Sequence, residues 1–226
     1  MTAVLVTRPA GGADPLVAEL ERRGYQAVAV PTVATRPLTV DWPDLTKYDW
    51  IVVTSAAGVS TLPDASTFSG RWAAVGRPTA QALRGRGFEV SLVPEQANGA
   101  ALAQAISQEN PSRVLLVRGS IAADDLPALL RARGAKVDEV VSYESVEGPD
   151  SSREALARAH VAAVVFASGS AVRGFLKLGG STDLPAITIG PRTSAVAREA
   201  GFTVLAEAAS QSADELATAV EKVIPR

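Results

Sequence analysis

Hydroxyl-bearing residues, glycines and arginines recur in this chain directly after short apolar runs. If each run is a strand of a parallel sheet, these residues lie at the carboxyl ends, where ligands bind and the next helix offers free backbone amides. A hydroxyl or a guanidinium beside such amides completes a carboxylate or phosphate site. The candidate ligand-binding residues in these segments are Arg8, Thr54, Ser55, Gly76, Thr79, Arg118, Gly119, Ser120, Ser168, Gly169, Ser170 and Thr193.

The same residues also have a purely structural explanation. Serine and threonine are common helix N-caps, so capping accounts for each hydroxyl taken alone. Arg8 and Arg118 occupy equivalent places in two similar segments. Gene duplication alone would preserve that equivalence, and surface arginines need no ligand. Both interpretations therefore stay open at this point.

Tyr143 is the titratable side chain at the end of an apolar run, beside an extended segment. A phenol there can donate a proton or a hydrogen bond to a departing hydroxyl group. The alternative is a packing residue whose hydroxyl points into water. Tyr143 is our candidate catalytic residue.

Several chemistries are excluded by residues that the sequence lacks. There is no cysteine, which removes disulfides, thiol nucleophiles and thiolate metal sites, and the one histidine is His160. Neither a G-x-x-x-x-G-K-[ST] motif nor a G-x-G-x-x-G after an expected strand is present. Ser170 lies in no nucleophile elbow. We predict a site without metal and without cofactor.

The elements that must position these residues follow from the hydrophobic pattern. Short β-branched runs alternate with amphipathic stretches, which is typical of βαβ units and an α/β fold with parallel sheets. We expect strands at 3–7, 26–30, 50–54, 72–75, 89–93, 113–117, 136–143, 162–167, 186–189 and 202–205.

Helix ends are also marked in the sequence. Asp14 followed by Pro15 predicts a helix start, and Gly24 predicts the end of that helix. Segments 151–154 and 212–215 both have the spacing of a capping box, with serine first and glutamate last. We assign these residues structural roles only.

The chain repeats itself at long range. Segments 4–8, 51–55 and 75–80 recur at 114–118, 164–168 and 189–194, at offsets of 110, 113 and 114 residues. This period is far longer than that of solenoid repeats, so it indicates a duplicated domain rather than a repeat array. Two similar lobes that face one another would form a cleft for a ligand.

Two extended segments, near 31–38 and 142–149, resemble linkers because proline or glycine interrupts their β-branched residues. If the chain leaves one lobe at the first and returns at the second, one lobe is discontinuous, 1–35 plus 147–226. The other lobe is then continuous, 39–143. A single crossing near residue 110, which gives two consecutive lobes, is the competing arrangement.

Composition narrows the class of protein. The chain has 226 residues, of which 47% are hydrophobic and 20% charged, as expected for a globular protein with a full core. Net charge is −2, so no positive field attracts nucleic acid. The first expected strand leaves no room for a signal peptide, and no apolar run approaches the length of a membrane span. We expect a cytoplasmic monomer without nucleic-acid or membrane partners.

Taken in order, these motifs resemble the uroporphyrinogen-III synthase family along essentially the whole chain. Each motif alone is weakly specific, and the resemblance depends on their order and spacing together. The segments concerned are 4–9, 48–55, 74–80, 114–119, 140–143 and 189–193.

The resemblance implies two Rossmann-like, or flavodoxin-like, lobes with parallel sheets, joined by a two-stranded linker. It implies a cofactor-free lyase that acts on hydroxymethylbilane, a linear tetrapyrrole. Loss of the hydroxyl on the first ring gives an azafulvene, which the substituted carbon of the last ring attacks to form a spiro intermediate. Reattachment inverts that ring and yields uroporphyrinogen III.

The family's tyrosine corresponds to Tyr143, where it would assist departure of the hydroxyl, and its recurrent threonines correspond to Thr79 and Thr193. Two positions depart from the pattern. Arg192 stands where the family often has a small polar residue, and Ala167 stands where the first copy has Thr54.

Two other functions remain possible from the sequence alone. One is a non-enzymatic two-lobed sensor that closes on a small anion, because fold does not decide function. The other is a sugar-phosphate or nucleotide-dependent enzyme, which the missing phosphate motif disfavours. Turnover of hydroxymethylbilane separates them.

Overall fold

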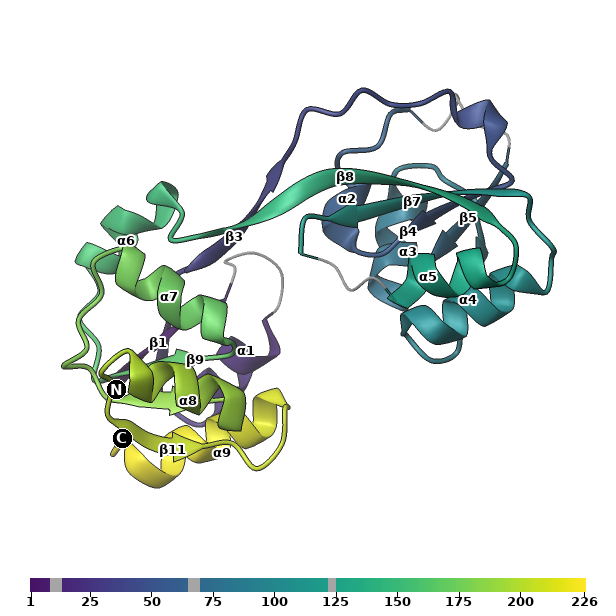
Figure 1. Cartoon of the computed structure of the whole chain (residues 1–226). Helices are drawn as coiled ribbons and strands as arrows, with labels where there is room; N and C mark the ends of the chain where they lie inside the picture. The colour runs from purple at the N-terminus through teal and green to yellow at the C-terminus, as the bar shows by residue number, and fades with distance from the viewer. Residues whose placement is uncertain (9–13, 65–69, 122–124) are drawn as a thin grey trace. The chain divides into compact units, whose positions relative to one another are not determined.

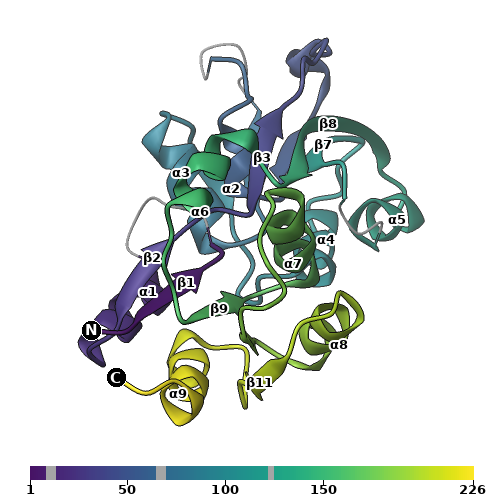
Figure 2. The ribbon, with the colours of Figure 1, turned by 90° about the vertical axis from the view of Figure 1, so that its left-hand side faces the viewer.

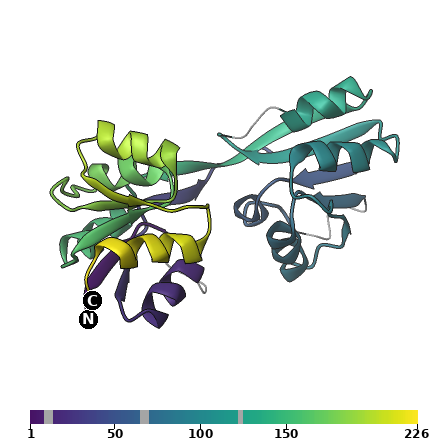
Figure 3. The same cartoon turned by 90° about the horizontal axis from the view of Figure 1, so that it is seen from below.

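The computed structural model describes residues 1–8, 14–64, 70–121 and 125–226. The chain forms two compact units (Figure 1). We call residues 1–34 with 146–226 the split unit and residues 35–145 the continuous unit. In Figure 1, Figure 2 and Figure 3 the two chain termini lie side by side in the split unit.

The split unit is built on a five-stranded sheet in which every pairing is parallel. Its spatial order is β11-β10-β9-β1-β2. The strands are β1 (Ala3–Val6), β2 (Gln26–Ala29), β9 (Ala163–Phe166), β10 (Ala186–Thr188) and β11 (Val204–Glu207). The helices are α1 (Pro15–Arg22), α6 (Arg153–Ala157), α7 (Gly169–Lys177), α8 (Pro191–Glu199) and α9 (Ala213–Val223), with a 3-10 turn at Asp150–Ser152.

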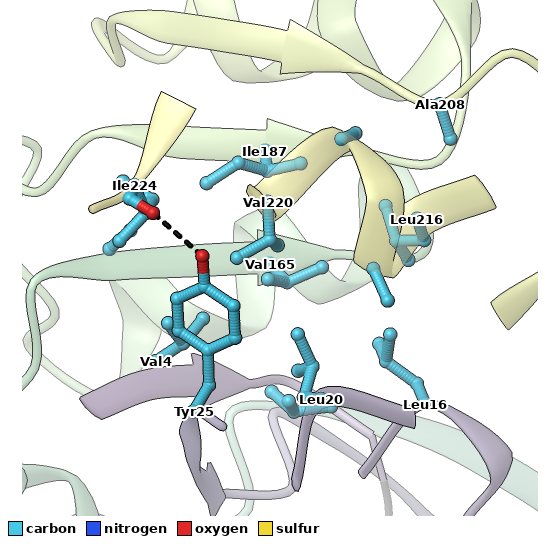
Figure 4. Packing of buried hydrophobic residues seen from close by; sticks show 14 residues of the cluster. Val4, Leu16, Leu20, Tyr25, Val165, Ile187, Ala208, Leu216, Val220 and Ile224 are labelled. Carbon is cyan, nitrogen blue, oxygen red and sulfur yellow. Dashed lines mark hydrogen bonds between the residues drawn. The ribbon is translucent and has the colours of Figure 1, made fainter. Parts of the chain in front are cut away.

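Helices cover both faces of this sheet (Figure 3). Val4 and Val6 pack with α1 and α9 on one face, and Leu5 packs with α7 and α8 on the other. A strand that is buried on both faces has no polar side to show, which explains the continuous apolar runs. The Tyr25 hydroxyl donates to the Ile224 carbonyl at 2.7 Å and closes the α9 side of the core (Figure 4).

The continuous unit contains most of a six-stranded sheet of order β3-β8-β7-β4-β5-β6. The strands are β3 (Val33–Pro37), β4 (Trp50–Val53), β5 (Arg71–Ala74), β6 (Val90–Leu92), β7 (Arg113–Gly119) and β8 (Lys136–Glu147). The helices are α2 (Ala56–Val59), α3 (Arg77–Gly85), α4 (Gly99–Ser107) and α5 (Asp125–Ala132), with a 3-10 turn at Leu45–Lys47. α2 and α3 cover one face, and α4 and α5 cover the other.

β3 and β8 form a two-stranded ribbon that links the units (Figure 1). The amide of Leu38 donates to the Ser142 carbonyl, and the amide of Gly148 donates to the Thr32 carbonyl. Residue numbers therefore rise on one strand as they fall on the other, so this pair is antiparallel. The second sheet is mixed for that reason: its other pairings are parallel, as predicted, and the β3–β8 pair is the two-stranded linker.

The two units have the same strand arrangement. The spatial order β2-β1-β9-β10-β11 in the split unit corresponds to β8-β7-β4-β5-β6 in the continuous unit. The split unit has the flavodoxin-like order along the chain, and the continuous unit is a circular permutation of it. The sequence repeats agree with this match, because segments 4–8 and 114–118 are β1 and β7 with the residues that follow. Apart from the linking strand β3, each unit combines two strands from one half of the sequence with three from the other half.

The predicted helix ends are correct in part. Asp14 caps α1 by accepting from the Leu16 amide at 2.8 Å, and Ser212 caps α9 by accepting from the Glu215 amide at 3.2 Å. The capping box that starts at Ser151 is wrong. A 3-10 turn occupies 150–152, so α6 begins at Arg153 after Ser152, which makes no side-chain cap bond.

Candidate functional site

The predicted site residues fall into two groups, one in each unit. The split unit holds Arg8, Ser168, Gly169, Ser170 and Thr193, and the continuous unit holds Thr54, Ser55, Gly76, Thr79, Arg118, Gly119, Ser120 and Tyr143. Each unit has a point where the strand order reverses, between β1 and β9 and between β7 and β4. Ligands of open α/β sheets bind beyond the carboxyl ends of strands at such switch points.

At the switch point of the split unit the serine hydroxyls are already engaged. Ser168 caps α7 by accepting from the Ala171 amide at 3.1 Å, and its oxygen lies 2.9 Å from that of Ser170. The Arg8 guanidinium is 3.6 Å from Asp14 and its side chain is 40% exposed. Arg8 is therefore a cation of this edge that remains accessible to a ligand.

Two helices begin with backbone amides that no side chain caps. Gly76 precedes α3 and Gly190 precedes α8, and neither glycine can supply a capping hydroxyl. Thr79 and Thr193 lie in the first turns of these helices and are only 4% and 5% exposed. Both threonines lie where they can stabilise the first turn of the helix. The backbone amides that no side chain caps can bind an anion.

At the switch point of the continuous unit the hydroxyls of Thr54 and Ser55 also have protein partners. Ser55 caps α2 through the Ala57 amide at 3.2 Å, and Thr54 donates to the Val117 carbonyl at 3.3 Å. Capping, the structural explanation, is thus correct for Ser55, as it is for Ser168. Both side chains are still half-buried rather than enclosed.

Arg118 is not a free cation. Its side chain is 8% exposed and its guanidinium binds Glu139 at 2.6 Å, while Arg131 binds the other oxygen of the same carboxylate at 2.8 Å. Burial favours a higher pKa for Glu139, but the hydrogen bonds from Arg131 and Arg118 outweigh it and hold that pKa below its ordinary value. Arg118 therefore serves an internal ion pair that joins β7, β8 and α5.

Tyr143 lies across the end of β7. Its backbone carbonyl accepts from the Ser120 amide at 3.0 Å, and β8 places it opposite Gly119. Its ring occupies the space where a side chain at Gly119 would otherwise stand, and it lies 3.4 Å from the position of a methyl group on Gly58. Among the residues that the structure describes, none hydrogen-bonds to the Tyr143 hydroxyl. That phenol is available to a ligand.

The continuous unit also has a cavity of about 710 Å³ at its carboxyl edge. It lies where β4 and β5 end and where α4 and α5 begin, so two helix N-termini contribute to its wall. Its lining is apolar apart from a few polar groups, a composition typical of small-molecule sites. The lining residues are Thr54, Val75, Asn98, Gly99, Ala100, Asp125, Leu126, Ala128 and Leu129.

A second hollow, of about 630 Å³, runs along α3. Arg77, Gln81 and Arg84 line it from the helix, and Glu95 lies on its opposite side. In the described part of the chain neither arginine forms an ion pair, so both can bind an anion.

Of the residues that line these hollows, only Thr54 in the first and Gly76 in the second are among those predicted from the sequence. Asn98 carried a usable signal, since asparagine before a helical run is a typical N-cap. Leu126 carried none, because its place in the wall depends on α5 packing beside α4. There, a methyl group at Gly99 would lie 3.2 Å from the Leu126 side chain.

Within the described ranges no group of three His, Cys, Asp or Glu side chains is arranged to hold a metal ion. No helix in that part of the chain is long and apolar enough to cross a membrane. The groups that the carboxyl edges do offer are free amides, hydroxyls, arginines and one phenol. Such a set can bind carboxylates and can donate a proton.

Comparisons with known proteins point to one family. The sequence profile of uroporphyrinogen-III synthase HemD matches residues 14–218. The uroporphyrinogen-III synthase of Chlorobaculum parvum is 32% identical over 229 residues, covering 90% of this chain and 92% of the relative. That of Synechococcus elongatus is 28% identical over 249 residues, covering 97% and 94%.

Solved structures agree on the fold. Uroporphyrinogen-III synthetase from Helicobacter pylori matches with a TM-score of 0.64 at 18% identity over 96% of each chain. A mutant uroporphyrinogen III synthase from Thermus thermophilus matches with a TM-score of 0.50 at 20% identity over 98% of each. The predicted two-lobed α/β fold is confirmed. The chain belongs to the uroporphyrinogen-III synthase family.

Proposed function

We propose that this protein cyclises hydroxymethylbilane to uroporphyrinogen III with loss of water and inversion of the last pyrrole ring. The observation that carries the proposal is the family match over nearly the whole chain. The same match favours an enzyme of tetrapyrrole biosynthesis over a sensor of small anions. The anion-binding groups at the carboxyl edges suit a substrate with many carboxylates.

Tyr143 is the proton donor in this proposal. The phenol O–H donates to the hydroxyl of the first ring, the carbon–oxygen bond breaks, and water leaves. The pyrrole nitrogen supplies the electron pair and keeps its proton, which gives the azafulvene in its N-protonated, cationic form. Attack by the substituted carbon of the last ring, fragmentation of the spiro intermediate and closure at the other carbon follow. Loss of a proton then restores the pyrrole and balances the one that Tyr143 gave.

Groups at the carboxyl edges that are not engaged within the protein hold the substrate. Arg8 and the uncapped amides at α3 and α8 are the groups we propose for carboxylates, because they are accessible cations or free donors. Arg77 and Arg192 flank those amides, are exposed, and lack ion-pair partners among the described residues. Positioning is the main task, since the substrate itself carries the reactive hydroxyl and the nucleophilic carbon.

The reaction needs neither metal nor cofactor in this proposal. We further propose that the enzyme works as a cytoplasmic monomer, in keeping with its lack of cysteine. The large hydrophobic side chains exposed on the described surface are few, namely Met1, Ile121, Val141 and Leu205. We also propose residues 1–35 plus 147–226 and residues 39–143 as its two domains.

The test is incubation with hydroxymethylbilane, oxidation of the products and separation of the type I and type III isomers. We expect predominantly type III from the wild type, and a rate at least several-fold lower from Tyr143→Phe. Tyr25→Phe is the matched control, since it removes a hydroxyl that serves only the core. It should keep the wild-type rate. Tight binding without turnover would contradict the proposal and support a sensor.

A further inference from the structure

We propose that Gly119 is a positioning residue for Tyr143: together with Gly58 and a β-bulge at Ser142 it forms a seat that sets the place of the phenol. This inference rests on the proposed function, in which Tyr143 donates the proton. From the sequence alone, Gly119 is a candidate substrate-binding residue. The structure gives it a different task.

The bulge decides which face of the sheet Tyr143 occupies. β8 pairs with β7 through Val140 with Val117 and then Val141 with Arg118, but Gly119 pairs with Tyr143. Ser142 is the extra residue. Side chains alternate along a strand, so without the bulge Tyr143 would lie on the face opposite to Val140. The bulge returns it to the face of Val117, and bulges are common where a side chain must be re-aimed.

Gly119 leaves the space that the ring then fills. A methyl group built on Gly119 would lie 2.7 Å from Cε2, 2.8 Å from Cζ and 3.0 Å from the oxygen of Tyr143. Carbon atoms pack at about 3.5–4.0 Å, so no side chain can share this space with the ring. The phenol oxygen thus lies directly against the backbone at the switch point between β7 and β4.

Gly58 forms the opposite side of the seat. A methyl group there would lie 3.4 Å from Cε1 of Tyr143 and 3.6 Å from Val117. This is a tight but ordinary contact. The ring is therefore confined between the end of β7 and α2, while its hydroxyl keeps no partner among the described residues. A rigid ring with a free hydroxyl is what a positioned proton donor requires.

The seat predicts how Gly119→Ala behaves. The added methyl must displace the ring, so the rate of type III formation should fall by the same several-fold factor as in Tyr143→Phe, mainly in kcat. The double variant, Gly119→Ala with Tyr143→Phe, should be no slower than Tyr143→Phe alone, because the phenol that Gly119 positions is already gone. Gly85→Ala is the matched control, since a methyl there meets nothing within 4 Å. It should keep the wild-type rate.

A second readout does not depend on activity. The chain has three tyrosines, so protein labelled with 3-fluorotyrosine can be followed by fluorine NMR, with Tyr143 assigned from Tyr143→Phe. Gly119→Ala should shift the Tyr143 resonance and leave those of Tyr25 and Tyr48 in place. If Gly119→Ala does not fold, Gly58→Val replaces it, because the larger side chain presses on the ring from α2. It must likewise shift the Tyr143 resonance and leave the other two tyrosine resonances in place.

The outcomes separate this inference from the proposed function. A wild type that makes no type III isomer refutes the proposed function, whereas the fluorine shift still decides whether Gly119 sets the place of the ring. If the wild type is active, an unshifted Tyr143 resonance overturns the inference. A wild-type rate in Gly119→Ala, or a further rate loss in the double variant, overturns it equally.

Discussion

Ser142 and Tyr143 are neighbours on β8 whose hydroxyl groups have opposite surroundings. The Tyr143 hydroxyl is open to a ligand, whereas the Ser142 hydroxyl is fully buried and has no hydrogen-bond partner in the described structure. A buried polar group without a partner costs stability because it has lost its water. The bulge that aims Tyr143 therefore leaves Ser142 in an unfavourable position.

Replacing Ser142 by alanine should stabilise the protein for that reason. We expect Ser142→Ala to raise the free energy of unfolding by about 1 kcal/mol, measured by urea denaturation. Ser194→Ala is the matched control. Ser194 is equally buried, but its hydroxyl bonds to Thr188 and Glu207, so its loss should cost about 1 kcal/mol. A destabilised Ser142→Ala would show that the hydroxyl has a partner after all.

Residue type did not predict which charged groups are already paired within the protein. Arg118 shows the limit, because the sequence places it at a strand end as it does Arg8. The two arginines differ because Arg118 forms an ion pair with Glu139, which lies on a neighbouring strand. Whether an arginine meets a carboxylate depends on strand pairing, which residue spacing does not reveal.

At the scale of elements, α1 and α9 are joined by a charged network as well as by the core. Glu19 on α1 accepts from Arg22 and Arg23, and Arg23 reaches Asp214 and Glu221 at the two ends of α9. The hydrogen bonds from Arg22 and Arg23 lower the pKa of Glu19 from 4.5 to about 2. The folded protein therefore holds this carboxylate ionised in acid where the unfolded chain would protonate it.

The stability that Glu19 contributes to the folded protein depends on pH. The folded pKa lies below the unfolded one, so the stabilisation is present above pH 4.5 and disappears as the pH falls toward 2. Glu19→Gln should lower the melting temperature at pH 7, and the difference from wild type should shrink between pH 4.5 and 2. Glu21→Gln, an exposed glutamate of the same helix, should show no such trend. A difference independent of pH would contradict the assignment.

Element boundaries were predictable where the cause is local. Asp14 and Pro15 start α1 because a capping carboxylate and a fixed φ act within one turn. The hydrophobic pattern did not predict β3 as a strand, although the family resemblance implied a two-stranded linker, and β8 was predicted to end at Tyr143 but continues to Glu147. These two segments pair across about a hundred residues of sequence, and hydrophobic periodicity contains no information about such a partner.

On the scale of the whole molecule, the sequence repeat and the compact units do not coincide. The repeat divides the chain near residue 110, whereas the continuous unit runs from 35 to 145. β7 and β8 come from the second half of the sequence, and β7 pairs with β4 from the first half. Both core clusters of the continuous unit contain only residues from within it.

A fragment of residues 35–145 should therefore fold alone. We expect it to unfold cooperatively in urea when followed by circular dichroism, because it keeps both faces of its sheet covered. The matched fragment, residues 1–110, has nearly the same length but lacks β7, the strand between β8 and β4. It should show no cooperative transition. Cooperative folding of 1–110 would mean that the repeat, rather than the compact unit, is the folding unit.

The sequence by itself determined the alternation of strands and helices, the repeat, and the residue types at the strand ends, since all of these are encoded in local pattern and composition. Only the tertiary structure decided that Arg118 is paired with Glu139 and that a bulge turns Tyr143 toward Gly58. The physical reason is that hydrogen bonds and packing join residues far apart in the chain. Their strength depends on distances that only the folded sheet brings about.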